Sequence, residues 1–441
     1  MLTATEVESV LSAELSAQHD GFALELEPGD PRVCENERGE LVARVALIVY
    51  ESDRSLRDVK SQELRLVAPE RREDAPRTTA FLRQWARALP KIVAALAMEV
   101  DVLMPCDLFL PMPLRDASLK SDEDFARAFS DPETIAAMIR ENERESISEE
   151  LLRCGLGDQP EAFLSLRRPA IWFDDHVWIE PDEEPTPVGS TRFGGEPDLP
   201  PGVEWPTFEG RPMTFAAQID LDSLQRFTAA KELPSTGLLS FFYTFDEYPS
   251  MPSRVMHLAS KEHLARRATP PGGDRRPELN AWPHELSVTM PSIDSPFYEA
   301  LLPVEKVAAF RRSLQAAERG EGSVTDPLSG LAQLVSHWDG YDPDSEQHRL
   351  LGYCQPHQGD VYAAAEVHTT RGGWDGFDDA SPEGIAASRA SRRWRLLLQA
   401  WAFIDGELLY EQDCGALYFL IPEDALTAHD WSRVWCELQC S

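Results

Sequence analysis

Short apolar runs that suit buried β-strands recur through the C-terminal half of this chain, and they limit what it can fold into. Each run combines aliphatic or aromatic residues with bounding Gly, Pro or charged residues, which is the pattern of buried or half-buried strands. The runs are Met213–Leu221, Gly237–Phe245, Ser287–Pro291, Arg393–Phe403 and Gly415–Ile421. One helical pattern, Val304–Gly320, lies among them. This half of the chain is therefore expected to form a strand-rich domain with few helices.

Residues 1–165 are predicted to form a separate, smaller α+β domain, and residues 166–441 a second domain. The segments that support the first are strand-like Gly21–Pro28 and Glu40–Ser52, and helix-like Thr78–Leu89 and Ser130–Asn142. The second domain begins with strand-like Ala170–Glu180. The Pro- and acid-rich segment Glu180–Ser190 that follows is either a linker or an ordered loop.

The Gly- and Pro-rich stretch "FGGEPDLPPGVEWP" (residues 193–206) precedes the strand pattern at Phe215. Glycines open backbone angles that other residues avoid, and prolines stiffen an extended approach, so the stretch is interpreted as scaffolding. A phosphate-binding loop is the weaker interpretation, because no helix start and no Lys-Ser/Thr pair follow. The residues assigned to this structural role along the domain are Gly194, Gly195, Pro197, Trp205, Pro206, Gln218, Asp220, Gly237 and Gly415.

Two segments echo each other: "FAAQIDLDSL" (Phe215–Leu224) and "LYFLIPEDAL" (Leu417–Leu426). Each looks like a strand that ends at Ile and continues into a short helix. Ten residues can match by chance, but the echo raises the possibility of a pseudo-symmetric sheet.

Several short blocks occur in an order that resembles the YwqG-like family. They are "FGGEPDLPPGVEWP", "FAAQIDL", "LPSTGLLSFFY", "HRLLGY" with "QGD", "RLLLQ", and "DCGALYFLIPEDA" with "WSRVWCELQC", over about residues 193–440. The resemblance implies an α+β fold with a largely antiparallel sheet and a domain of unknown function. For some members it also implies neighbouring bacterial toxin and immunity genes. Two departures are Cys354, where the family usually has Pro after Gly-Tyr, and His357, where it often has Ile.

Composition narrows the partners that this chain can have. The 441 residues include 42 Lys plus Arg and 76 Asp plus Glu, for a formal net charge of −34. Such a charge repels nucleic acids and anionic membranes and attracts basic partners, although it can also serve solubility alone. The seven cysteines form no CxxC pair, and the first residues do not resemble a signal peptide. A cytoplasmic protein is therefore expected.

No motif for nucleotide binding, hydrolysis or a zinc protease is present. The histidines from His337 to His368 do not have zinc-ligand spacing, and a Cys354/His pair lacks an oxyanion-hole signature. Cys436 and Cys440 are expected on a terminal helix, where four-residue spacing would place them on one face. No catalytic residue, metal or cofactor is predicted.

Aromatic residues in Gly- and Asp-rich text are the better binding candidates, because a Trp in "GGWDGFDD" is hard to bury without a partner or a lid role. The loop could also fold over the sheet and bury it. The binding candidates are Trp338, Tyr341, His348, Tyr353, Gln358, Asp360, Trp374 and Asp413.

Two functions remain open. The first is a non-enzymatic acidic binding protein, such as an immunity or antitoxin-type protein that occludes a basic toxin. The alternative is an enzyme or small-ligand-binding protein with its pocket near residues 348–360, which would gather His348, Gln358, Asp360 and Asp413. Residues 1–165 could instead act as a docking module for the rest of the chain.

Overall fold

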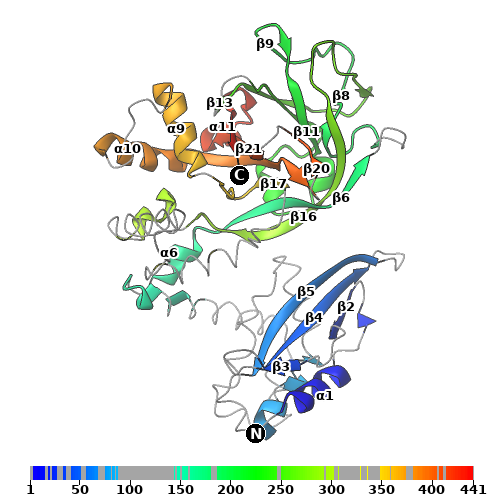
Figure 1. Cartoon of the computed structure of the whole chain (residues 1–441), viewed down its shortest axis with the longest axis vertical. Helices are drawn as coiled ribbons and strands as arrows, with labels where there is room; N and C mark the ends of the chain where they lie inside the picture. The colour runs from blue at the N-terminus through cyan, green and yellow to red at the C-terminus, as the bar shows by residue number, and fades with distance from the viewer. Residues whose placement is uncertain are drawn as a thin grey trace. The chain divides into compact units, whose positions relative to one another are not determined.

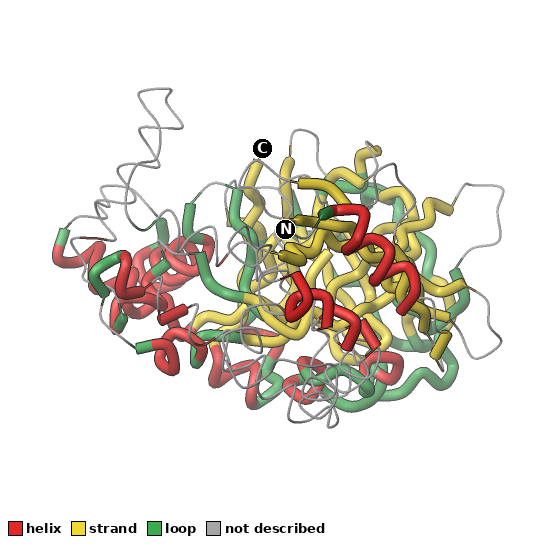
Figure 2. The backbone as a smooth tube through the Cα atoms, turned by 90° about the horizontal axis from the view of Figure 1, so that it is seen from below, coloured by secondary structure: helices red, strands yellow, loops and turns green. Residues whose placement is uncertain are grey.

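In the computed structural model the chain divides into two compact units, Met1–Glu161 and Ala162–Ser441 (Figure 1). The residues that the structure describes are 3–14, 18–19, 22–26, 33–35, 41–50, 56–67, 75–80, 82–84, 86–87, 144, 147–148, 151–156, 159–179, 186–245, 250–292, 295–301, 306, 328, 335, 348–357, 359–373, 381–404, 407–410 and 414–440. Strands dominate the described backbone, and the helices lie outside them (Figure 2).

The first unit combines helices with an antiparallel sheet. Helix α1 (Ala4–Glu14) begins with a capping box, in which Thr3 Oγ1 accepts from the Glu6 N–H at 3.3 Å and Glu6 Oε2 accepts from the Thr3 N–H at 2.8 Å. The strands are β1 (Gln18–His19), β2 (Phe22–Leu26), β3 (Val33–Glu35), β4 (Leu41–Tyr50) and β5 (Leu56–Val67), with β4 paired to β2, β3 and β5. The two predicted strands are confirmed as β2 and β4. The described residues between 75 and 87 are helical, whereas the predicted helix at 130–142 lies outside the described residues.

The second unit is built on one large antiparallel sheet, which confirms the α+β class with a mainly antiparallel C-terminal sheet. Its order is β13-β22-β21-β18-β17-β6-β16-β7-β11-β12-β14. The strand bounds are β6 (Arg168–Ile179), β7 (Arg192–Gly195), β11 (Thr214–Asp220), β12 (Leu238–Tyr243), β13 (Ser250–Met251), β14 (Ser253–Leu258), β16 (Arg276–Thr289), β17 (His348–Leu351), β18 (Trp394–Trp401), β21 (Cys414–Pro422) and β22 (Trp435–Cys440).

Smaller elements surround this sheet. Strand pairs are β8 (Asp198–Leu199) with β15 (Ala265–Arg266), β9 (Thr207–Phe208) with β10 (Arg211–Pro212), and β19 (Phe403–Ile404) with β20 (Glu407–Leu408). The helices are α6 (Pro160–Leu164), α9 (Val361–Arg371), α10 (Pro382–Ala390) and α11 (Glu423–Thr427), and the 3₁₀ turns are η2 (Asp222–Leu224), η3 (Ala229–Glu232), η4 (Pro296–Ala300), η5 (Ser391–Arg393) and η6 (Trp431–Arg433).

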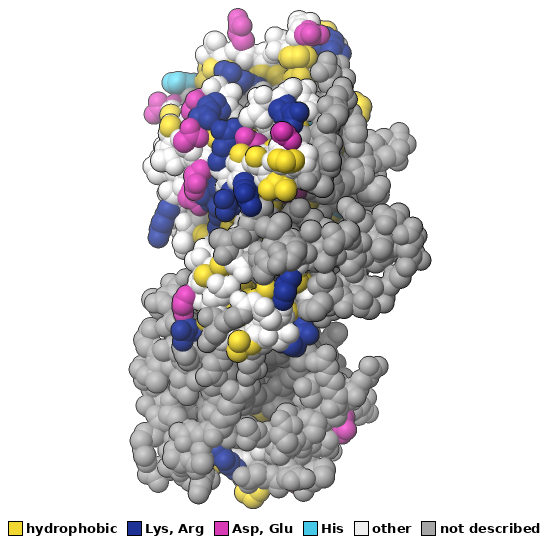
Figure 3. Space-filling view, turned by 90° about the vertical axis from the view of Figure 1, so that its left-hand side faces the viewer, with side chains coloured by type: hydrophobic (Ala, Val, Ile, Leu, Met, Phe, Trp, Pro, Cys, Tyr) yellow, Lys and Arg dark blue, Asp and Glu magenta, His cyan; other side chains and the backbone are white. Residues whose placement is uncertain are grey.

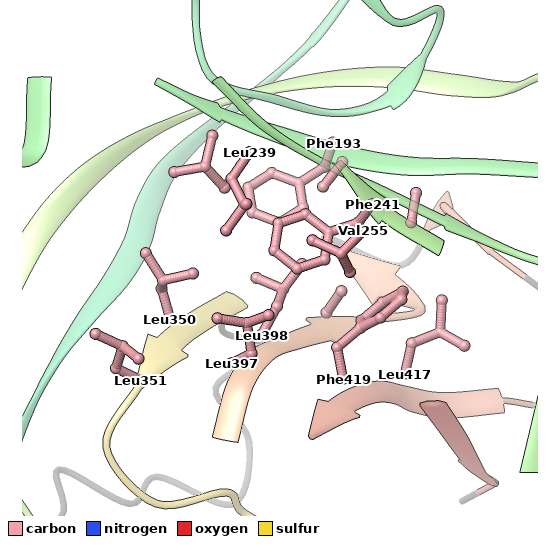
Figure 4. Close-up of a cluster of buried hydrophobic side chains, with 14 of the residues drawn as sticks. Phe193, Leu239, Phe241, Val255, Leu350, Leu351, Leu397, Leu398, Leu417 and Phe419 are labelled. Carbon is pink, nitrogen blue, oxygen red and sulfur yellow. The ribbon is translucent and has the colours of Figure 1, made fainter. Parts of the chain in front are cut away.

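The sheet curls until its two ends meet around a common core. Strand β13 pairs with β22, while β14, two residues further on, pairs with β12 at the opposite edge. Inside, the rings of Phe241 on β12 and Phe419 on β21 lie 5.1 Å apart (Figure 4). The leucines of both halves point into the same space, so this inner face is the main hydrophobic core. A second buried cluster, which includes Tyr353, Tyr362 and Leu396, lies on the outer face under α9.

The two sides of the sheet repeat each other. From the centre outward, β16-β7-β11-β12-β14 lie on one side and β6-β17-β18-β21-β22 on the other. The pairing register shifts between Phe215 and Ala217 where β11 meets β12, and between Leu396 and Leu398 where β18 meets β21. These shifts occupy equivalent places, so β11 corresponds to β18 and β12 to β21.

Strands β7 and β17 end in the same unusual backbone conformation. Gly194 and Gly195 have φ angles of 63° and 69°, and Leu351 and Gly352 have angles of 63° and 70°. Glycine reaches this region freely, whereas leucine is strained there. At Gly194 a Cβ would lie 1.9 Å from the carbonyl oxygen of Pro277, so this copy needs glycine for space as well. The match makes β7 and β17 counterparts, with Arg192 equivalent to Arg349 and Asp198 to Gln355.

The pseudo-symmetric sheet raised by the sequence is therefore present, but the echo that suggested it does not follow the repeat. Both echoing segments do run from a strand into a short helix, η2 after β11 and α11 after β21. However, β11 corresponds to β18, and β21 corresponds to β12. The similarity of Phe215–Leu224 to Leu417–Leu426 arises because both are inner strands of the same kind of sheet.

Two further sequence predictions are wrong in detail. Cys436 and Cys440 lie on strand β22 rather than on a helix, because the alternation of Cys436, Glu437, Leu438 and Gln439 serves two buried faces. The predicted strand at 287–291 is only the end of β16, whose first half contains Pro277 at a bulge. The predicted helix at 304–320 lies outside the described residues, except that Lys306 is helical.

Candidate functional site

The loop that the sequence singled out, residues 348–360, contains an extended segment that crosses the outer face of the sheet. We call residues 352–357, together with Gly359 and Asp360, the strap; Gln358 lies outside the described residues. The strap leaves β17 at Leu351 and ends at Asp360, the residue that caps α9. It has no strand partner, so its backbone groups need other hydrogen-bonding partners.

Side chains of the strands beneath supply these partners. Arg349, Gln399, Tyr418 and Glu437 lie side by side across β17, β18, β21 and β22. Arg349 Nη1 donates to the Tyr353 carbonyl at 2.9 Å. Gln399 Oε1 accepts from the Gln355 N–H at 2.8 Å, and the Tyr418 hydroxyl donates to the Gln355 carbonyl at 2.8 Å.

The next row of the sheet holds the far end of the strap. Gln439 Oε1 accepts from the His357 N–H at 2.8 Å, and Gln439 Nε2 donates to the Gly359 carbonyl at 3.4 Å and to Glu437 Oε1 at 3.2 Å. The anchored residues alternate along the strap, at 353, 355, 357 and 359. Three gaps between neighbouring strands span about 14 Å, and four extended residues span about 13 Å, so the segment from Tyr353 to His357 is long enough to cross from β17 to β22.

Both ends of the strap are fixed by backbone geometry. At Gly352 a Cβ would lie 2.6 Å from Thr289 Oγ1 and 2.7 Å from the Ala170 Cβ, so the chain passes too close to β16 and β6 for a side chain. At the other end, Asp360 Oδ1 accepts from the N–H groups of Tyr362 at 2.8 Å and Ala363 at 3.2 Å. These contacts place the strap in one position over the sheet.

Burial shifts the ionisation of several groups around the strap. It raises the pKa of the Glu437 carboxyl to about 8, with Asp360 adding to the rise, so this carboxyl is neutral at pH 7. Burial also lowers the pKa of His357, whose ring packs edge-on against Trp401 at 4.5 Å. Glu437 Oε2, Gln399 Nε2 and His357 Nε2 are buried with no hydrogen-bonding partner among the described residues.

Three of the predicted binding residues are described, and they lie on opposite faces of the sheet. His348 faces the inner core, where its ring stacks on Phe193 at 3.7 Å and its Nδ1 accepts from the Trp401 N–H at 3.1 Å. Tyr353 and Asp360 belong to the strap on the outer face. The remaining candidates lie outside the described residues: Trp338, Tyr341, Gln358, Trp374 and Asp413.

The first half of the sheet carries a shorter version of the same arrangement. Gln218, the counterpart of Gln399, accepts through Oε1 from the Asp198 N–H at 2.9 Å and donates through Nε2 to the Ser190 carbonyl at 2.7 Å. Pro197 and Pro206 each accept a backbone N–H at 2.9 Å, from Arg267 and Met213.

Most of the other residues assigned a structural role lie in the first half of the sheet, whereas Gly415 lies beside His357 of the strap. Trp205 Nε1 donates to the Met213 carbonyl at 2.8 Å, and Asp220 pairs with Lys261 at 2.7 Å. At Gly237 a Cβ would lie 2.0 Å from the Leu258 carbonyl oxygen, and at Gly415 it would lie 2.6 Å from the His357 ring.

Sequence reasoning missed a buried ion cluster in this first half. Asp198 pairs with Arg192 and, at 2.9 Å, with Arg266. Glu278 approaches the same two arginines at 3.9 and 3.2 Å. Arg192 and Asp198 are completely buried. The only sequence signal was an arginine at the start of an apolar strand, which is too common to identify a cluster that forms between distant segments.

If the two sheet halves are equivalent, their glutamines should contribute equally. Gln218→Ala and Gln399→Ala should each lower the free energy of unfolding by about 1–3 kcal/mol, because each leaves a buried backbone N–H without its acceptor. Chemical denaturation followed by tryptophan fluorescence measures both. Gln225→Ala is the control, since the side chain of Gln225 donates to the nearby Leu221 carbonyl and holds neither the strap nor Asp198. A loss at only one of the two glutamines would contradict the equivalence.

Among the described residues, no group of three or more His, Cys, Asp or Glu side chains is arranged to hold a metal ion. No helix in the described part of the chain is both long and apolar enough to cross a membrane. The fold and the strap thus define a class: an internally duplicated α+β domain that uses buried polar side chains to hold its own backbone.

The chain belongs to the family described as "Domain of unknown function (DUF1963)", whose model matches residues 191–440, more than half of its length. The match spans both repeats, and it begins after β6, the central strand that completes the second one. None of the curated proteins compared with this chain matches it.

Proposed function

We propose that this protein is a non-enzymatic binding protein that recognises a basic protein partner. The observation that carries the proposal is the net charge of −34, with acidic residues in excess in both units. In this proposal the chain is a bacterial, cytoplasmic member of the YwqG-like group and acts as an immunity or antitoxin-type protein. Binding would block the partner's working surface rather than alter it chemically.

The way the ionisable groups of the strap are used supports binding over catalysis. Asp360 caps a helix, Arg349 and Tyr418 bind strap carbonyls, and Glu437 is bound to Gln439. A catalytic acid or base needs a free atom that can reach substrate. Here the contacts of these side chains hold the strap, and the one oxygen of Glu437 that has no partner among the described residues is buried.

In this proposal, recognition depends on the long-range field of the net charge rather than on a single acidic patch. Figure 3 shows Lys and Arg side chains next to Asp and Glu over the described residues of one face, rather than a uniformly acidic surface. A net field of this sign speeds the encounter with a basic partner, whereas mixed local charges fix the orientation.

Salt dependence of association tests the proposal. With a basic partner recovered from the native source, the association rate should fall at least about tenfold when the salt concentration rises from about 20 mM to about 500 mM. Surface plasmon resonance measures this rate, and an acidic protein of similar size serves as the control. Failure to recover any basic protein, or an association rate that salt leaves unchanged, would contradict the proposal.

A further inference from the structure

Arg168, the first residue of β6, places its guanidinium group against aromatic rings on the outer face of the sheet. The guanidinium carbon lies 4.4 Å from the ring centre of Tyr353 and 5.2 Å from that of Phe297. These two rings contact each other edge to face at 5.2 Å. A guanidinium over aromatic rings is attracted by their π-systems, and its planar array of N–H groups can still bind a planar acceptor.

This guanidinium has no acidic partner among the described residues. Its Nη1 is buried without a hydrogen-bonding partner there. Burial lowers the pKa of Arg168, which reflects the cost of desolvating its charge. Buried charges are normally paired, because burying an isolated charge carries a large desolvation penalty. Arg168 as a whole residue remains partly exposed.

The pseudo-symmetric counterpart shows what is missing. Leu351 pairs with Ala170, and its counterpart Gly194 pairs with Glu278, so Arg168 in β6 corresponds to Arg276 in β16. Arg276 binds the Asp274 carboxylate at 2.5 Å and the Tyr410 carbonyl at 3.0 Å. The repeat therefore supplies a carboxylate to one arginine, and no described residue supplies one to the other.

Nearby acids are engaged elsewhere. Arg395, whose positive charge contributes to lowering the pKa of Arg168, forms ion pairs with Glu232 at 2.9 Å and with Glu423 at 3.1 Å. These two glutamates balance Arg395 and contact it directly. Among the described residues, Arg168 is therefore given no hydrogen-bond acceptor that carries a negative charge.

We propose that Arg168, held in place by the buried rings of Tyr353 and Phe297, forms a binding site for the carboxylate group of a small ligand. A planar carboxylate accepts two N–H groups of the guanidinium at once. A phosphate dianion fits less well, because its second charge would be left uncompensated near Glu423. The site does not depend on the proposed basic partner.

Titration of the full-length protein with benzoate tests the site, followed by calorimetry and by the NMR signals of the arginine Nε–H groups. Benzoate should bind and shift the Arg168 signal while leaving the Arg276 signal unchanged. Benzamide, which has the same body without the charge, should bind at least about tenfold more weakly. R168Q should lose at least about tenfold in benzoate affinity, and R168K should also lose affinity because it lacks the planar fork. R276K is the matched control and should bind like the unaltered protein.

Three results would overturn the proposal: equal binding of benzoate and benzamide, unchanged benzoate affinity in a folded R168Q, or tighter binding of inorganic phosphate than of benzoate. Thermal unfolding establishes whether R168Q is folded. If it is not, the NMR titration of the unaltered protein decides, since a benzoate complex that leaves the Arg168 signal in place excludes this site.

Discussion

Glu437→Gln should make the protein more stable at pH 8 than it is with its natural glutamate, by about 4 kcal/mol. Glu437 is almost fully buried on β22, and burial raises its pKa to about 8. The unfolded chain ionises this carboxyl at its ordinary pKa of 4.5, whereas the folded chain must keep it neutral or bury a charge. Glutamine has the same shape and no proton to lose, and its Oε1 can still accept from Gln439.

The sign of the effect fixes its pH window. Between pH 4.5 and about 8 the folded state binds one more proton at Glu437 than the unfolded state does. Stability therefore falls as the pH rises through this window, and the glutamine variant escapes the fall. The gain should shrink to about 1 kcal/mol at pH 5. All tryptophans except Trp85 lie in the second unit, so fluorescence-detected denaturation at several pH values reports this unit.

Glu366→Gln is the matched control with the opposite sign. Glu366 is also buried, but its Oε2 accepts from Arg393 Nε at 2.7 Å and from Trp394 Nε1 at 2.9 Å. Loss of a charged acceptor with two donors should lower the free energy of unfolding by about 1–3 kcal/mol. A Glu437→Gln protein that is no more stable at pH 8 than at pH 5, relative to the natural protein, would show that the carboxylate is tolerated under the strap.

The strands of the second unit could be predicted because their patterns are local. The apolar runs at 213–221, 237–245, 393–403 and 415–421 match β11, β12, β18 and β21 closely. In contrast, Pro277 and Pro283 argue against a strand over most of β16, because proline is disfavoured inside a sheet. Only the structure shows that Pro277 lies at a bulge. The repeat could not be aligned from sequence either, because it preserves a bulge, two backbone angles and only scattered side chains, such as Gln218 with Gln399 and Arg192 with Arg349.

The candidate site was far less predictable, because its contacts join segments that are distant in the chain. Gln399 and Gln439 look like ordinary polar residues within strands, yet each holds the backbone of a loop more than 40 residues away. His348 looks like a companion of Asp360, but strand alternation turns it to the opposite face of the sheet. The sequence did not single out Arg168, because only the folded structure shows that no described residue supplies it with an acidic partner.

Asp198→Asn should be the most damaging single polar substitution in the first half of the sheet, with a loss of about 3–5 kcal/mol in the free energy of unfolding. Asp198 is completely buried and receives the Gly189 N–H and Gln218 Nε2, each at 2.8 Å, as well as both arginines. An asparagine keeps one acceptor oxygen but places N–H donors against other donors. It also removes the charge that balances Arg192, and Glu278 alone must then serve two guanidinium groups.

Denaturation of Asp198→Asn and of Asp222→Asn separates burial from simple charge loss. Asp222 pairs with Lys261 at 3.0 Å on the surface, so its replacement should cost less than about 1 kcal/mol. Arg192→Met together with Asp198→Asn should cost less than the two changes added, because removal of both partners leaves no uncompensated charge in the core. Additive losses would mean that the two residues act separately.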